Sequence, residues 1–233
     1  LILDLVSPEL NARIFVYTAL SLPGLSHFFI WQLVTFQFLH GGPLHVLLNC
    51  AMLWMFGRAV EYQVGRSRFF WLYLLSGVAG GLLQMLCSLM FPSHFGTGPV
   101  VGASAGVFGV IAAFAVLNAE QFITTLLAFI IPVTMKAKYL LAVEVVISLL
   151  GMLERNSGVA HAAHLGGIIG AIIFVKWVVL GHVSGFRWPA LPAMPWKKRE
   201  LVGARTKSKG WVKAARPEPE ELPPAEFISK EVD

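Results

Sequence analysis

The sequence has few charged residues for its length. Only 13% of its 233 residues are Asp, Glu, Lys or Arg, whereas about a quarter is usual in a soluble domain. They are also unevenly spread, with 14 among residues 1–182 and 17 among residues 183–233. The first part cannot cover a water-facing surface, and the second cannot form a core. This excludes an ordinary soluble globule and predicts an all-α polytopic membrane domain over residues 1–182, followed by a polar, flexible tail over residues 183–233.

Cysteines and targeting signals are also scarce. Cys50 and Cys87 both lie inside apolar runs, so a disulfide framework is not expected. The N-terminus shows no charged segment followed by a cleavage site of the secretory kind. Residues Leu1–Val6 instead resemble the end of an apolar segment whose beginning is absent.

Long apolar runs, in contrast, are abundant. Five of them approach the roughly 20 residues that cross a bilayer. They cover residues 44–62, 69–91, 104–117, 138–153 and 160–180. Residues 122–132 are also apolar, but they are too few to span and end at a proline, so we expect an interfacial or re-entrant segment there.

The positive charges predict the orientation of the spans. Placing the basic tail in the cytoplasm leaves only Arg13 and Arg155 on the outer side, in agreement with the positive-inside bias. Residues 6–40, 92–101 and 154–159 would then lie outside. The basic tail could also indicate nucleic-acid binding, but beside membrane spans we favour the cytoplasmic interpretation and expect no nucleic-acid partner.

Uncharged polar residues within the apolar runs are the candidates for chemistry, because polar groups in a membrane are costly. His45 and Asn49 are four residues apart, and therefore on one helical face. Ser104 lies within the small-residue run 102–106, and His164 precedes a group of glycines. With the predicted orientation, all four lie near the outer leaflet at similar depth.

These residue types suit acyl transfer. A serine hydroxyl becomes a nucleophile when a base such as His164 stands within hydrogen-bond reach. Gly102, Gly106 and Gly109 near Ser104, and Gly166 and Gly170 after His164, would let the two helices approach closely. His45, Asn49 and the backbone N–H of Ser104 could donate hydrogen bonds to the oxyanion. No acid lies on either helix, so a Ser–His dyad is favoured over a triad.

These residues also allow other interpretations. Ser104 in a Gly/Ala run could serve helix packing alone, and His161 is a rival base on nearly the same helical face as His164. Glu144 lies about six residues into a span. We expect its carboxyl group to make a buried hydrogen bond or to reach the inner membrane surface, and we do not expect a catalytic or binding role for it. Arg58 and Glu61 suggest a structural ion pair. A metal site is not expected, because no HExxH pattern or matching carboxylate accompanies the histidines.

At this point the residues resemble a family. Residues 31–45 with Asn49 look like the second span of rhomboid intramembrane serine proteases. The run Gly102–Gly106 is similar to their nucleophile motif, and Ala163–Gly167 to their catalytic histidine motif. The resemblance covers about residues 25–182, and the three motifs in this order are specific together.

The resemblance implies a rhomboid-like helical bundle with a six-span core, of which the first span is truncated here. It implies Ser104 as nucleophile, His164 as general base and acid, and His45 and Asn49 in the oxyanion hole. Phe108 would stack on the catalytic ring, at a position where the family often has Tyr. Substrates would be single-span membrane proteins cut near the outer face, in a bacterial cytoplasmic membrane and without a cofactor.

Two other functions were considered. A rhomboid-like pseudoprotease would bind membrane proteins for quality control without cutting them, but loss of the Ser or His usually marks that class, and both are present. A transporter is disfavoured because no inverted repeat or pair of broken helices is evident.

Overall fold

The computed structural model describes residues 8–127, 131–155 and 157–181. The short N-terminal elements are α2 (Pro8–Thr18), α3 (Leu22–Ser26), α4 (Gln32–Thr35) and the 3-10 turn η1 (Phe36–Phe38). The segment Leu1–Val6 and the predicted tail, residues 183–233, lie outside the described residues. The division of the chain at residue 182 therefore stays a prediction.

All five predicted spans are helical. They are α5 (Pro43–Val64), α6 (Arg66–Met90), α8 (Ser104–Leu117), α9 (Ala137–Gly151) and α10 (His161–Phe174), the last continued by a π-helical turn, η2 (Val175–Val179). Helices α5, α6 and α10 with η2 are long and apolar enough to cross a membrane, and α8 is apolar but shorter. The prediction of a helical membrane protein is confirmed.

Local sequence explains where the first long helices begin. Pro43 stands in the first turn of α5, where its missing N–H costs no hydrogen bond and its fixed φ suits a helix. Gly65 alone separates α5 from α6 and has a φ of 83°. This left-handed conformation is readily adopted by glycine, so the chain reverses direction within one residue.

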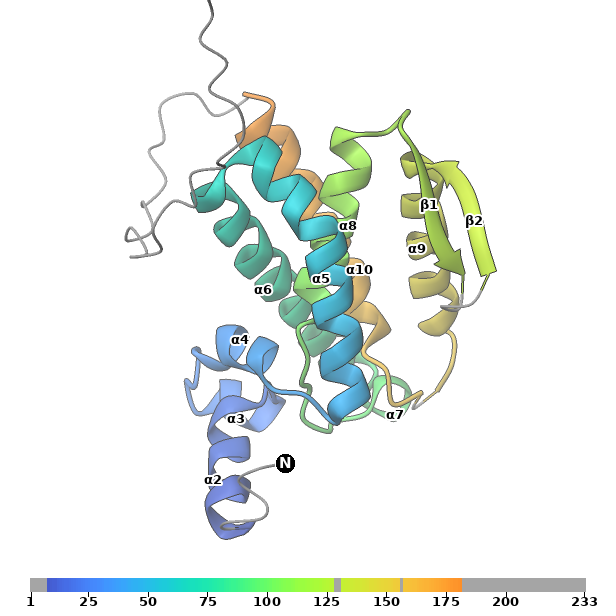
Figure 1. Ribbon diagram of the computed structural model, residues 1–233. Helices are drawn as coiled ribbons and strands as arrows, with labels where there is room; N and C mark the ends of the chain where they lie inside the picture. The colour runs from blue at the N-terminus through green and yellow to red at the C-terminus, as the bar shows by residue number, and fades with distance from the viewer. Residues whose placement is uncertain (1–7, 128–130, 156, 182–233) are drawn as a thin grey trace, which may run out of the picture. The chain divides into compact units, whose positions relative to one another are not determined.

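Helix α8 lies at the centre of the bundle, between α5, α6, α9 and α10 (Figure 1). Its sequence is apolar on every side, which is typical of a fully enclosed helix. Val110 and Ile111 are 0% and 1% exposed and belong to a core that includes Val60 of α5, Leu72 of α6 and Ile168 of α10. The four neighbouring helices thereby enclose α8.

Glycines bring α10 against its neighbours, although not in the predicted arrangement. A Cβ on Gly167 would collide with the carbonyl oxygen of Ala105 in α8. Gly166 and Gly170 instead face Ala79 of α6, where a Cβ on Gly166 would lie 2.8 Å from the Ala79 oxygen. The prediction that these two glycines face α8 is wrong, because α10 packs on both α6 and α8, and Gly166 and Gly170 lie on the side that meets α6.

The N-terminal segment is fastened to the bundle by backbone and amide hydrogen bonds. Gln37, 1% exposed, donates from Nε2 to the Leu74 carbonyl of α6 at 3.4 Å. Leu20 pairs with Val100 as an isolated β-bridge. The Gly102 N–H donates to the carbonyl of Phe36 at 3.0 Å. These contacts fix the strand-like residues that lead into Ser104.

Residues 122–127 and 131–136 form a pair of antiparallel strands, where the sequence suggested an interfacial or re-entrant segment over residues 122–132. Strand β1 (Phe122–Leu127) pairs antiparallel with β2 (Ile131–Lys136), with Thr124 opposite Thr134. Both strands are rich in β-branched residues, which favour extended backbone. The two strands lie beside α9 (Figure 1), and β2 leads directly into that helix.

The short helix α7 (Pro92–Phe95) is a single turn between α6 and the loop to α8. Its His94 donates from Nε2 to the carbonyl of Met152 at 2.7 Å. Arg155 donates to the Ser93 carbonyl at 3.4 Å. The loop after α6 and the loop before α10 are thus tied to each other.

We predict that Gly167→Ala destabilises the protein, because the added methyl group meets the backbone of Ala105 rather than a side chain that can move. The expected loss is about 1–3 kcal/mol of unfolding free energy, as in other overpacked cores. Unfolding in detergent measures it. Gly98→Ala is the control, because no atom lies within 4 Å of its added Cβ. Equal stability of the two variants would contradict the close packing of α10 on α8.

Candidate active site

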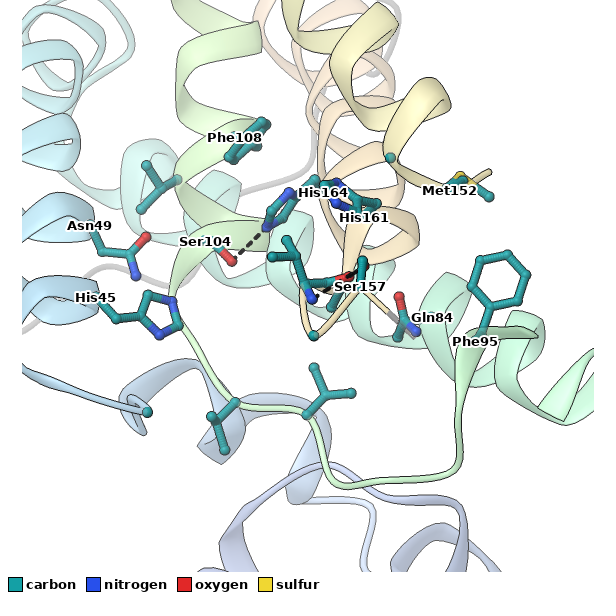
Figure 2. A pocket seen from close by; sticks show the side chains of 18 of the residues that line it. His45, Asn49, Gln84, Phe95, Ser104, Phe108, Met152, Ser157, His161 and His164 are labelled. Carbon is teal, nitrogen blue, oxygen red and sulfur yellow. Dashed lines mark hydrogen bonds between the residues drawn. The ribbon is translucent and has the colours of Figure 1, made fainter. Parts of the chain in front are cut away.

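Three helix beginnings meet around one cavity. Ser104 is the first residue of α8, His164 lies in the first turn of α10, and His45 lies in the first turn of α5. All three line a cavity of about 910 Å³, together with Asn49 of α5 (Figure 2). The four polar residues that the sequence placed at similar depth therefore share one site.

Ser104 and His164 are joined by a hydrogen bond. The Nε2 of His164 is 2.9 Å from the Oγ of Ser104 (Figure 2). Ser104 is partly exposed to the cavity, while His164 is only 9% exposed. A neutral imidazole accepts the hydroxyl proton through Nε2 when its Nδ1 carries the ring proton. This pair has the geometry of a nucleophile and its general base.

The ring of His164 is held by aromatic contacts. Phe108, one turn after Ser104 on α8, stacks on it with ring centroids 4.2 Å apart and planes 8° from parallel. His161 meets it edge-on at 5.8 Å. The stacking fixes the plane of the imidazole and so directs Nε2 at Ser104.

His161, the rival base, occupies a different place. Its ring packs against Gly151 at the end of α9, where an added Cβ would overlap the imidazole. Its Nδ1 is buried and makes no hydrogen bond within the described part of the chain. The histidine that reaches Ser104 is His164.

No carboxylate of the described residues hydrogen-bonds to His164. The arrangement is that of a Ser–His pair without a third acidic member. Nor do three His, Cys, Asp or Glu side chains gather as metal ligands anywhere in the described ranges.

Asn49 contributes an unpaired donor to the lining of the same cavity. The Nδ2 of Asn49 is buried and has no hydrogen-bond partner among the described residues, although it lines the cavity beside Ser104. Buried amide donors are normally paired. A free N–H next to a nucleophile is what stabilisation of a developing oxyanion requires.

His45 stands against the backbone that precedes Ser104. Gly102 has a φ of 131°, which favours glycine, and a Cβ there would lie 2.8 Å from His45 Cε1 and 3.6 Å from Ser104 Oγ. Gly102 therefore leaves the space that His45 needs to approach Ser104. Gly106 has a different role, because a Cβ there would lie 2.7 Å from the Tyr73 ring of α6.

A second histidine supports His45 from the loop. The rings of His40 and His45 lie edge to face at 5.1 Å. Burial, together with the nearby His45, lowers the pKa of His40 below its usual value. This shift favours a neutral His40 beside the His45 ring.

Gln84 of α6 belongs to the site, although the sequence analysis missed it. Its Oε1 accepts a hydrogen bond from the Ala163 N–H at 3.3 Å, and its Nε2 donates to Ser88 Oγ at 3.5 Å. It therefore satisfies a backbone donor in the first turn of α10 that the helix itself leaves unpaired. An amide within an apolar run, four residues before a serine, was the signal that could have found it.

Two predicted structural roles are not seen. Arg58 and Glu61 form no ion pair in the described chain, and the guanidinium of Arg58 instead lies 5.6 Å from the Trp54 ring centroid. Glu144 neither finds a hydrogen bond for its Oε2 nor reaches the surface, being 7% exposed. It lines the cavity instead.

The fold and site define a helical integral membrane protein with a Ser–His pair near one end of its spans. The sequence profile of the rhomboid domain matches residues 27–182. The chain belongs to the rhomboid family.

Curated relatives agree with this assignment. The chain is 31% identical over 159 residues to "Rhomboid protease GluP" of Bacillus subtilis, a match covering 67% of this chain and 27% of that protein. It is 32% identical to "Rhomboid protein 1, mitochondrial" of Saccharomyces cerevisiae, covering 67% and 44%. A third relative, "Presenilin-associated rhomboid-like protein A, mitochondrial" of Danio rerio, is 29% identical, covering 72% and 39%. The chain thus spans less than half the length of these three relatives.

We predict that Gln84→Ala lowers the free energy of unfolding by about 1–3 kcal/mol, because the buried Ala163 N–H loses its acceptor. Gln63→Ala removes a comparable side chain whose bond to Asn118 is exposed, and it should cost about 0.5 kcal/mol or less. Denaturation in detergent compares the two. Equal losses would show that Gln84 does not cap α10.

Proposed function

We propose that this protein is an intramembrane serine endopeptidase in which Ser104 is the nucleophile and His164 the general base and acid. The observation that carries the proposal is the 2.9 Å contact between His164 Nε2 and Ser104 Oγ in a cavity. Membership of the rhomboid family supports it, and one relative carries the printed name of a protease.

In the first half of the reaction, Ser104 Oγ attacks the carbonyl carbon of the scissile peptide bond while His164 Nε2 takes the hydroxyl proton. The carbonyl oxygen becomes an oxyanion. Asn49 Nδ2, the His45 ring and the backbone N–H of Ser104 are the donors available to it. As the carbon–nitrogen bond breaks, His164 passes the proton to the leaving amine.

In the second half, a water molecule attacks the acyl-enzyme and gives its proton to His164. The ester bond to Ser104 breaks, the carboxylic acid product leaves, and the proton returns to Ser104 Oγ. The exposed cavity-lining loops, at Gly98 and Gly158, offer a route for water to the buried pair. Both halves use one base, which the stacked Phe108 keeps in plane.

We further propose that the substrates are single-span membrane proteins cut near the outer face of a bacterial cytoplasmic membrane. The distribution of Lys and Arg supports an orientation in which the helix beginnings at Pro43, Ser104 and His161 lie toward that side. The predicted cytoplasmic tail belongs to the same topology. Family resemblance supplies the substrate class.

The alternative is an inactive rhomboid-like module that binds membrane proteins. Two observations favour catalysis over binding alone. Ser104 and His164 are hydrogen-bonded, and the unpaired amide of Asn49 faces the same cavity. A buried unpaired donor has an energetic cost that binding alone does not explain.

Cleavage of a single-span reporter in proteoliposomes tests the proposal. Ser104→Ala and His164→Ala are each expected to reduce kcat by about a thousandfold or more, because the two groups act as a unit. His161→Ala is the matched control on the same helix and should keep the larger part of the activity. Cleavage unaffected by Ser104→Ala would overturn the proposed nucleophile. Cleavage that is lost in His161→Ala but retained in His164→Ala would move the base.

We predict a separate effect for the oxyanion donor. Asn49→Leu keeps the approximate volume but cannot donate, so kcat should fall about 100- to 1000-fold while KM changes little. Asn118→Ala, at the far end of α8, is the control and should leave kcat near wild type. A rise in KM with an unchanged kcat would assign Asn49 to substrate binding instead.

A further inference from the structure

Glu144 has no role in the proposed reaction, yet it lines the cavity. It is 7% exposed, and its Oε2 is buried without a hydrogen-bond partner among the described residues. A buried carboxyl group without a partner is costly, and such groups in native proteins call for an explanation. Neither the predicted internal hydrogen bond nor snorkelling accounts for it.

The position of Glu144 along its helix places it at the inner end of the cavity. Gly151, at the active-site end of α9, contacts His161, and Glu144 lies seven residues earlier. Seven residues are two helical turns, or about 10 Å along the axis. Glu144 is therefore well below the level of the Ser–His pair.

Two other helices contribute cavity residues at the same depth. Met52 lies seven residues after His45 on α5, and Ile111 lies seven residues after Ser104 on α8. Both line the cavity with Glu144. The inner end is thus an apolar pocket, formed by three helices, with one carboxyl group in its wall. We name these three residues the inner pocket.

No protein cation is available to Glu144 there. The described residues that line the cavity include no Lys or Arg. The other acid among them, Glu154, is exposed near the loops. Since no described residue hydrogen-bonds to Glu144 Oε2, an occupant of the cavity that carries a donor group would supply a partner that these residues do not.

We propose that the inner pocket is a specificity subsite for a substrate side chain with an apolar stem and a hydrogen-bond donor at its tip. Lysine and glutamine have this form, and their methylene groups suit Met52 and Ile111 while the tip reaches the carboxyl group. The assignment rests on the proposed function for its substrate, but the subsite itself is a binding property. Binding and cleavage can therefore be tested separately.

The test is a reporter panel with one single-span substrate whose cleavage region is rich in alanine. Leu, Gln or Lys is placed singly at each of four positions on either side of the scissile bond. At one position, wild type should favour Gln or Lys over Leu by about tenfold in kcat/KM, the size of one buried hydrogen bond. The Gln and Lys arms distinguish a neutral from a charged donor.

Variants show whether Glu144 sets the preference. Glu144→Leu should abolish or reverse it, and Glu144→Gln should retain a preference for Gln over Leu. Ser148→Ala is the control, because Ser148 is buried one turn further on α9 but does not line the cavity; it should keep the wild-type ratio. Because each result is a ratio within one variant, a general loss of activity cancels.

Binding of the same panel to Ser104→Ala, measured by fluorescence anisotropy in detergent, separates the two proposals. Two results would contradict the subsite but not the proposed peptidase activity. One is cleavage at equal rates for Leu, Gln and Lys at every position, and the other is a preference ratio unchanged by Glu144→Leu. A donor preference in binding without cleavage by wild type keeps the subsite and overturns the peptidase. Equal binding of the whole panel means that only water meets Glu144, which also overturns the subsite.

Discussion

The close approach of α10 to α8 is the constraint on which the site depends. His164 reaches Ser104 because Gly167 lets the backbone of α10 rest against Ala105, one residue after the serine. In a bilayer, helix association gains little from the hydrophobic effect and relies on van der Waals contact between small residues. The same residues that stabilise the bundle therefore set the distance between Ser104 and His164.

Uncharged amide groups of side chains and backbone hold further segments in place around the site. Gln37 fastens the N-terminal segment to α6, and Gln84 satisfies the first turn of α10. The Gly102 N–H, bound to Phe36, directs the chain into Ser104. Each bond joins segments that are distant in sequence, and each is strengthened where water is excluded. A bundle with few charges is thus held in register by uncharged amides around the site.

Much of this arrangement could be predicted from sequence. Apolar runs are long signals, so all five helices were found, and the shared helical face of His45 and Asn49 follows from their spacing. The strands β1 and β2 were missed because a short apolar run does not distinguish a strand from a re-entrant segment. Which neighbour Gly166 and Gly170 face was also predicted wrongly, because periodicity defines a face but not the helix that covers it. The unpaired carboxyl oxygen of Glu144 could not be predicted either, because its surroundings depend on how three helices pack together.

The most direct test of the central claim is to map the adduct formed with a fluorophosphonate probe by peptide mass spectrometry. The probe reacts with a serine that an adjacent base has activated, so it reports the chemistry without any substrate. We expect one modified residue, Ser104, in wild-type protein in detergent. Ser157 also lines the cavity and is the internal comparison. An adduct on Ser157, or no adduct on Ser104, would contradict the assignment of the Ser104–His164 pair.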